Sequence, residues 1–149
     1  MNIQFLSSTH KHFKRDIFLI FLLSLFQYIL DISTSKKLYT KCSNIGTQTF
    51  ILLHHFIFIY SFVAWISNNK TILIANCILI LAMFYHWNSN NDVCEWTRHT
   101  KIKCGIDENL RTFFKIFFPS MNDKGRVSQK TYLTFSLLIS VIKLVQNKK

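Results

Sequence analysis

Two histidines that could bind a metal or a haem lie near the ends of two neighbouring apolar segments, and a cysteine that could add a metal ligand follows in the next loop. His54 stands near the start of the first segment, residues 50–66, and His86 near the end of the second, residues 72–87. Five polar residues join the segments, so an antiparallel hairpin of two helices would bring both histidines to the same end. Cys94 follows in the next loop.

Three interpretations of this end of the hairpin follow from its residue types. In the first, the histidines are structural and hydrogen-bond to each other, to water or to loop carbonyls, because an unpartnered polar ring is costly in lipid. In the second, His54, His86 and Cys94 are metal ligands and bind zinc with an open fourth position, or His99 supplies a ligand. In the third, the two histidines ligate haem. We favour the first, and therefore predict no cofactor, with zinc or haem as alternatives.

Small residues suggest how the two arms of the hairpin pack. Helices in lipid approach closely where their side chains are small, and the antiparallel register that uses them pairs Ala64 with Ala75, Ser61 with Leu79, Ile57 with Ala82 and His54 with His86. Such close packing leaves little room for haem. His55 lies about 100° from His54 around the helix, so it is expected to face another helix or lipid. Asn76 is expected to hydrogen-bond across to another helix.

The composition predicts an integral membrane protein. Half of the 149 residues are hydrophobic, 15 are Phe, and the apolar residues stand in blocks. We predict an all-α fold forming a single membrane domain over residues 1–149. About four transmembrane helices are expected, at residues 17–30, 50–66, 72–87 and 131–145. A cleaved signal peptide is the alternative for the first of these.

The longest polar segment, residues 88–130, contains one amphipathic stretch. Residues 106–118 place Ile106, Leu110 and three Phe on one helical face and charged residues on the other. Such a helix is expected to lie in the membrane interface and tether the loop.

The net charge of +11 comes from basic residues that flank the apolar segments and can contact anionic lipid headgroups. Because no nucleic-acid-binding motif accompanies them, we expect no nucleic-acid partner. Their density near the termini and the tight turn predicts cytoplasmic termini. The spans are short, which suits the endoplasmic reticulum or an internal viral or host membrane, and the bias toward Phe, Ile, Asn and Lys indicates an AT-rich genome.

In a four-helix topology three cysteines lie on the same side of the membrane: Cys42, Cys94 and Cys104. If that side is oxidising, a Cys94–Cys104 disulfide is the simplest bridge, with Cys42 left over or competing. No Cys-x-x-Cys pair is present, so a thiol oxidoreductase of that type is not indicated.

A motif follows the second arm of the hairpin: His86-Trp87, an Asn-rich turn that includes Asn91, and then Cys94-x-x-Thr97. This order resembles small uncharacterised polytopic membrane proteins of large DNA viruses and some microbes. The resemblance implies a helical membrane protein and no particular activity. In the motif, Trp87 is expected to anchor at the interface, the Asn run to turn the chain, and Thr97 or Asn91 to hydrogen-bond the histidine end.

The sequence thus predicts a multi-pass membrane protein that is structural or partner-binding, without catalysis. Its partners would be the lipid bilayer and a membrane protein, or a second copy of the chain. The alternative is a metal- or haem-dependent membrane enzyme centred on His54 and His86.

Overall fold

The computed structural model describes residues 3–34, 44–104 and 125–146 and is all-helical within them, which confirms the predicted fold class. The helices, in chain order, are α1 (Ile3–Thr34), α3 (Ile45–Val63), the short 3-10 helix η2 (Ala64–Ile66), α4 (Lys70–Ser89), α5 (Glu95–Cys104) and α7 (Gly125–Gln146). The interfacial helix predicted over residues 106–118 lies outside the described residues.

Within the part of the chain that the structure describes, three helical segments are long and apolar enough to cross a membrane: His12–Ser33, Ile45–Ile66 and Lys70–Ser89. Each has 20 to 22 residues, which at about 1.5 Å per residue gives roughly 30–33 Å and matches a hydrocarbon core. The predicted spans were shorter because polar residues at both ends were left out, although the helices continue through them. The predicted fourth span, residues 131–145, lies within α7, which is not one of these three segments.

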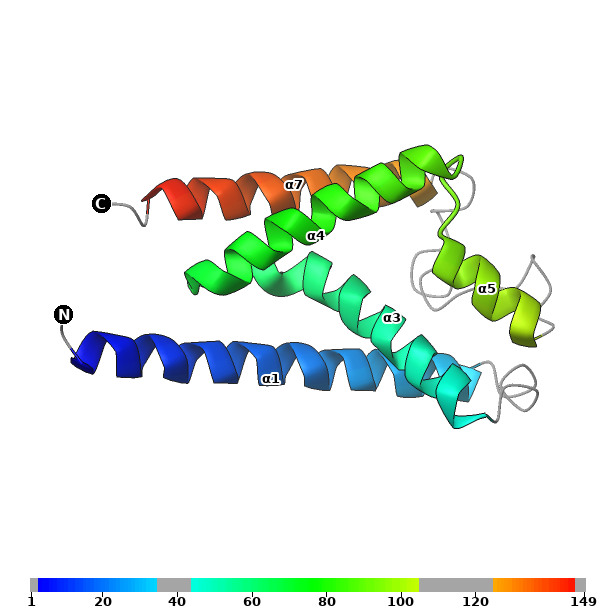
Figure 1. The fold of residues 1–149 in the computed structure, drawn as a ribbon, viewed down its shortest axis with the longest axis horizontal. Coiled ribbons are helices and arrows are strands. Elements are labelled where there is room, and N and C mark those ends of the chain that lie inside the picture. The colour runs from blue at the N-terminus through cyan, green and yellow to red at the C-terminus, as the bar shows by residue number, and fades with distance from the viewer. Residues whose placement is uncertain (1–2, 35–43, 105–124, 147–149) are drawn as a thin grey trace.

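The helices are arranged as two antiparallel pairs. The most extensive contacts join α1 to α3 and α4 to α7, whereas α3 and α4 diverge from their connecting turn (Figure 1). Helix α5 lies at the open end, beyond the N-terminal part of α3 and the C-terminal part of α4 (Figure 1). The close-packed α3–α4 hairpin predicted from the small residues is therefore wrong.

The buried amide of Asn76 on α4 explains why α4 pairs with α7 rather than with α3. Asn76 is fully buried and its Nδ2 donates to Ser136 Oγ at 3.1 Å and to Ser140 Oγ at 3.0 Å, both on α7. Ser136 Oγ in turn donates to the Ser61 carbonyl of α3 at 2.9 Å. A buried amide is costly without partners; α7 supplies both partners of the nitrogen, whereas Asn76 Oδ1 has none among the described residues. The prediction that Asn76 joins two helices is confirmed.

The buried residues of α4 lie on the same face as Asn76. Leu73 and Ile80, one turn to either side of Asn76, are fully buried, whereas Ala75 and Ala82 of the predicted small-residue face are exposed. Ser61 Oγ lies 3.3 Å from Met83 Sδ, one helical turn beyond the predicted Leu79. Hydrogen bonding of Asn76 thus rotates α4 away from the face that its alanines would have used.

Hydrogen bonds at the α3–α4 turn tie both helix pairs together. Ser67 Oγ donates to Asp16 Oδ2 of α1 at 2.6 Å, and Lys143 Nζ of α7 donates to the carbonyls of Ile66 and Ser67 at 3.0 and 3.2 Å. Asn69 caps α4 by accepting from the backbone of its first turn. The two pairs are therefore joined at the end of the molecule opposite α5.

Candidate functional site

The chain reverses direction between α4 and α5 in a turn built from Asn and Asp. Asn91 and Asp92 adopt positive φ angles of 51° and 63°, a conformation that these two residue types tolerate better than most. The backbone N–H of Asp92 returns to the Trp87 carbonyl at 2.8 Å, which closes the turn. The prediction that the Asn run turns the chain is confirmed, and the turn brings Cys94 back to the open end of the bundle.

Cys94 occupies the N-cap position of α5. Its carbonyl accepts the first intrahelical hydrogen bond, from Arg98 N–H at 3.0 Å. Its sulfur receives hydrogen bonds from the backbone and the side chain of Thr97, as the side chain of an N-cap residue does from the third helical position. The N-terminus of a helix favours negative charge, so this position stabilises a thiolate.

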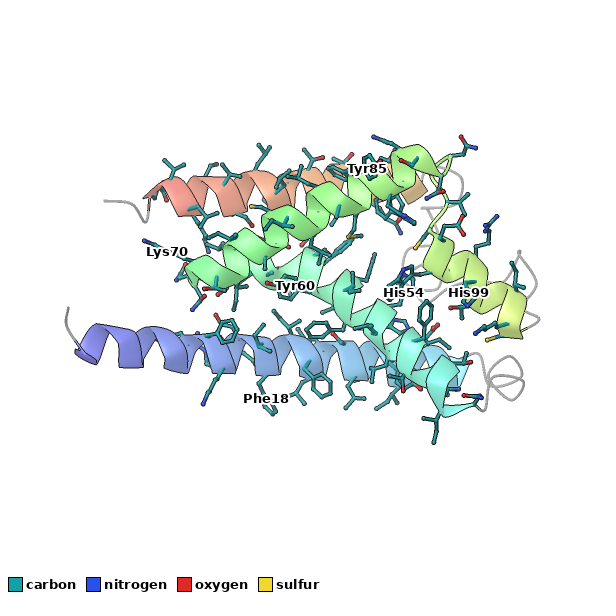
Figure 2. The ribbon with its side chains drawn as sticks, viewed as in Figure 1. Phe18, His54, Tyr60, Lys70, Tyr85 and His99 are labelled. Carbon is teal, nitrogen blue, oxygen red and sulfur yellow. The ribbon has the colours of Figure 1, made fainter. Side chains whose placement is uncertain are left out.

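His54 of α3 faces Cys94. The distance from Cys94 Sγ to His54 Nε2 is 3.7 Å, and Figure 2 shows His54 on the side of α3 that faces α5. The Trp96 ring lies 5.9 Å from the His54 ring and stacks on Phe50 at 4.6 Å. Phe50 also contacts the ring of His99 at 5.8 Å. These aromatic contacts hold α5 against α3 and fix the cysteine–histidine pair.

The surroundings of Cys94 lower its pKa from an ordinary 9.0 to about 6. Burial raises this pKa, but the hydrogen bond and positive charge of His54 and the two hydrogen bonds from Thr97 outweigh it. A thiol with that pKa is about 90% thiolate at pH 7. Cys94 is partly buried and not disulfide-bonded, and a thiolate that solvent can reach is the reactive form of cysteine.

The neighbouring His55 takes a different partner, on the face of α3 that contacts α1. Its Nε2 lies 3.3 Å from Asp31 Oδ2 of α1, and the two side chains are 13% and 15% exposed. The edge of the Tyr28 ring also contacts it. The prediction that His55 faces another helix or lipid is confirmed, the partner being α1. Asp31 is a site residue that the sequence analysis missed, although an acid at the end of an apolar segment was a usable signal.

His86 does not face His54. Its Nε2 accepts a hydrogen bond from the backbone N–H of Glu95 at 3.2 Å, and Asn90 Nδ2 lies 3.2 Å from its Nδ1. The predicted His54–His86 pairing is wrong because α3 and α4 diverge and the α4–α5 loop enters between them. His86 instead joins the end of α4 to the start of α5, in agreement with the structural interpretation of this residue.

The three predicted metal ligands do not come together. His54 meets Cys94, while His86 bonds to the loop backbone. In residues 3–34, 44–104 and 125–146, no group of three or more His, Cys, Asp or Glu side chains is placed to hold a metal ion. The residues on which the zinc and haem alternatives depend are therefore used in other contacts.

The predicted Cys94–Cys104 disulfide is also not formed. Cys94 is a free thiol, whereas Cys104 is disulfide-bonded and buried. The ten residues of α5 separate the two by roughly 15 Å along the helix, and a disulfide requires Cα atoms within about 7 Å. Cys42 lies outside the described residues.

Three other motif residues, Trp87, Thr97 and Asn91, take roles that differ from the expected ones. Trp87 is only 3% exposed and packs with Ile80 of α4 and Leu133 of α7, so the predicted interface anchor is a core residue. Thr97 bonds Cys94 rather than a histidine, and Asn90 rather than Asn91 contacts His86.

The fold and the site together define an all-helical protein with three helices fit to cross a membrane and a thiol–imidazole pair at one end. Comparison of the chain with protein-family models, with curated proteins and with solved structures finds no match. The resemblance to small polytopic membrane proteins of viruses therefore stays a prediction from its motif.

Proposed function

We propose that this chain is a multi-pass membrane protein that captures a partner covalently through Cys94, with His54 holding the sulfur as a thiolate. The observation that carries the proposal is the 3.7 Å contact between Cys94 Sγ and His54 Nε2 at the N-terminus of α5. The partner-binding role predicted from the sequence then has a chemical basis, and it requires neither zinc nor haem.

The reaction that suits this site is thiol–disulfide exchange. The Cys94 thiolate attacks one sulfur of a partner disulfide, a new S–S bond forms, and the old S–S bond breaks. The departing thiolate takes up a proton from water. No external oxidant or reductant is consumed, because one disulfide replaces another.

Two independent features indicate which side of the membrane the Cys94 site faces. Lys70 lies at the end of the molecule that holds both chain termini (Figures 1 and 2), and Lys143 reaches the α3–α4 turn at the same end. Basic residues favour the cytoplasmic side. Cys104, which is disulfide-bonded, lies on α5 at the opposite end, and disulfides persist in oxidising compartments. Both features favour cytoplasmic termini, with Cys94 on the lumenal or external side.

In this topology α7 serves as the fourth transmembrane helix. It has 22 residues, or roughly 33 Å, and runs antiparallel to α4 along most of its length (Figure 1). Its buried face presents Leu133, Ser136 and Ser140 to the neighbouring helices, and Lys143 reaches the carbonyls of the α3–α4 turn. A helix with a buried polar seam and basic ends has a lower overall apolarity than a lipid-facing one, yet can still cross within a bundle.

The test is covalent capture by the full chain in neutral detergent. The protein is incubated at pH 7 with hydroxyethyl disulfide, a small neutral disulfide, and the adduct is measured by intact mass. We expect one adduct that is lost in Cys94→Ser and kept in Cys77→Ser, the matched removal of the other free thiol among the described residues. An adduct that persists in Cys94→Ser, or none on the unmodified chain, would contradict the proposal.

A further inference from the structure

A pocket of about 590 Å³ lies between α1 and the α3–α4 turn, at the end of the molecule away from Cys94. Its walls are graded in polarity along α1. Toward the terminus the lining includes His12 and Arg15, and further along the helix it includes Leu19 and Leu23. Ile66 completes the apolar wall from η2. Its volume falls within the range of ligand sites.

The charges around this pocket are mostly positive. Arg15 and Asp16 are the charged residues of the lining. Lys14 stands next to Arg15 on α1, Lys70 begins α4, and Lys143 Nζ bonds the Ile66 carbonyl of the turn, so three lysines lie at the same end of the molecule outside the lining. Both carboxylate oxygens of Asp16 are already bonded, Oδ1 to Arg15 at 3.0 Å and Oδ2 to Ser67 at 2.6 Å. Arg15 has five N–H donors, of which the contacts to Asp16 use two. Its side chain is 62% exposed, so the remaining donors can reach an anion.

The apolar wall points to a ligand that carries a hydrocarbon chain. Leu19, Leu23 and Ile66 are 50%, 48% and 60% exposed although they line a concave site, and they belong to segments long and apolar enough to cross a membrane. In a bilayer they would face acyl chains. The polar residues of the pocket lie toward the helix end, where headgroups would lie.

We propose that this pocket binds an anionic glycerophospholipid from the surrounding leaflet. The phosphate pairs with Arg15 and one acyl chain lies along Leu19, Leu23 and Ile66. The positive charge at this end of the molecule selects an anionic headgroup over a zwitterionic one, since the four basic residues named above outnumber Asp16 by three. This site is separate from Cys94, at the other end of the bundle.

Lipid binding to the delipidated full chain in neutral detergent tests the proposal by native mass spectrometry. Phosphatidylglycerol is titrated against phosphatidylcholine of the same acyl chains. We expect phosphatidylglycerol to bind about tenfold more tightly, and the preference to disappear in Arg15→Gln, which removes a charge-assisted hydrogen bond. Leu19→Trp, which fills the pocket, should weaken both lipids about tenfold.

Two matched variants control for loss of charge and for added bulk. Arg98→Gln removes an exposed arginine that also pairs with an acid, Glu95, at the other end of the molecule. Leu22→Trp adds the same bulk on α1 at an exposed leucine outside the pocket lining. Both should bind lipid as the unmodified chain does, with unchanged helicity by circular dichroism.

Three results would overturn the proposal. Equal affinity for the two lipids would show that the charge selects nothing. Normal binding by Leu19→Trp would show that no acyl chain enters the pocket. Displacement of the lipid by glycerol 3-phosphate would show that a free phosphate, rather than a lipid, is the ligand.

Discussion

The acidity of Cys94 is the property of the site that an experiment can measure most directly. At a pKa of about 6, half of the thiol is thiolate at pH 6, against about 0.1% for an ordinary thiol of pKa 9. A more acidic thiolate is a weaker nucleophile, by about 20-fold over this difference in pKa. The two effects combine to make Cys94 about 20-fold faster than an ordinary thiol at pH 6 and about tenfold slower at pH 9.

Replacement of His54 by Ala should move the reaction rate toward that of an ordinary thiol. The variant loses the hydrogen bond and the positive charge that lower the pKa of Cys94 but keeps both bonds from Thr97, so the full 20-fold change is an upper limit. As pH falls through about 6 the unmodified thiolate is protonated and its rate falls, whereas the variant already loses its rate at higher pH. The two pH profiles should therefore cross between pH 7 and pH 9.

The assay is alkylation by iodoacetamide of the full chain in detergent, followed by intact mass at each pH. A Cys77→Ser background removes the other free thiol of the described residues, Cys94→Ser provides the blank, and His12→Ala is the histidine control, since His12 lies on α1 in the pocket at the other end of the molecule. A midpoint near 9 in the unmodified chain, or profiles that coincide with and without His54, would refute the assigned pairing of Cys94 and His54.

Three further predictions concern the contacts that position the site. Asn76→Ala should destabilise the fold by about 1 kcal/mol in a detergent unfolding titration, because Ser136 and Ser140 lose their shared partner. Ala75→Ser, at an exposed position of the same helix, should leave the stability unchanged. Equal unfolding midpoints for the two variants would contradict the hydrogen bonds of Asn76 to α7. Asp31→Asn should increase protease cleavage near the start of α3 by weakening the contact to His55, with unchanged cleavage counting against that contact. Asn91→Val should lower the free energy of unfolding by about 1–2 kcal/mol, since a β-branched residue resists positive φ. Asn88→Val, in the last turn of α4, should lower it by less. The reverse order of the two effects would refute the turn geometry.

The sequence allowed the helices to be predicted because their signals are local. Apolar runs bounded by polar residues mark α3 and α4, and the Asn-rich turn marks where α4 ends. The expectation that Asn76 bonds across to another helix was sound for the same reason, since any buried amide needs a partner. The identity of the partner was not predictable, because Ser136 and Ser140 are some 60 residues away in the chain.

The sequence was enough to identify the residues of the candidate site, but not to predict which of them contact each other. His54 and Cys94 were both identified, but the geometry that joins them depends on the divergence of α3 and α4, which no local pattern records. The small residues suggested a tight hairpin, and hydrogen bonding of Asn76 to α7 outweighed them. Trp87 was assigned to the interface from its place in the chain, although a tryptophan at a helix end can equally turn inward against Leu133.

The cysteine–histidine pair spans the two halves of the molecule. His54 belongs to the α1–α3 half, whereas Cys94 packs with the core of α4 and α7, and hydrogen bonds at the far turn join the halves. His54 lies twelve residues from Ile66, or roughly 18 Å along the helix, so a rotation of about 5° at the turn would move it by about 1.6 Å and lengthen the 3.7 Å contact to Cys94. The acidity of one sulfur atom therefore depends on the angle between the two helix pairs.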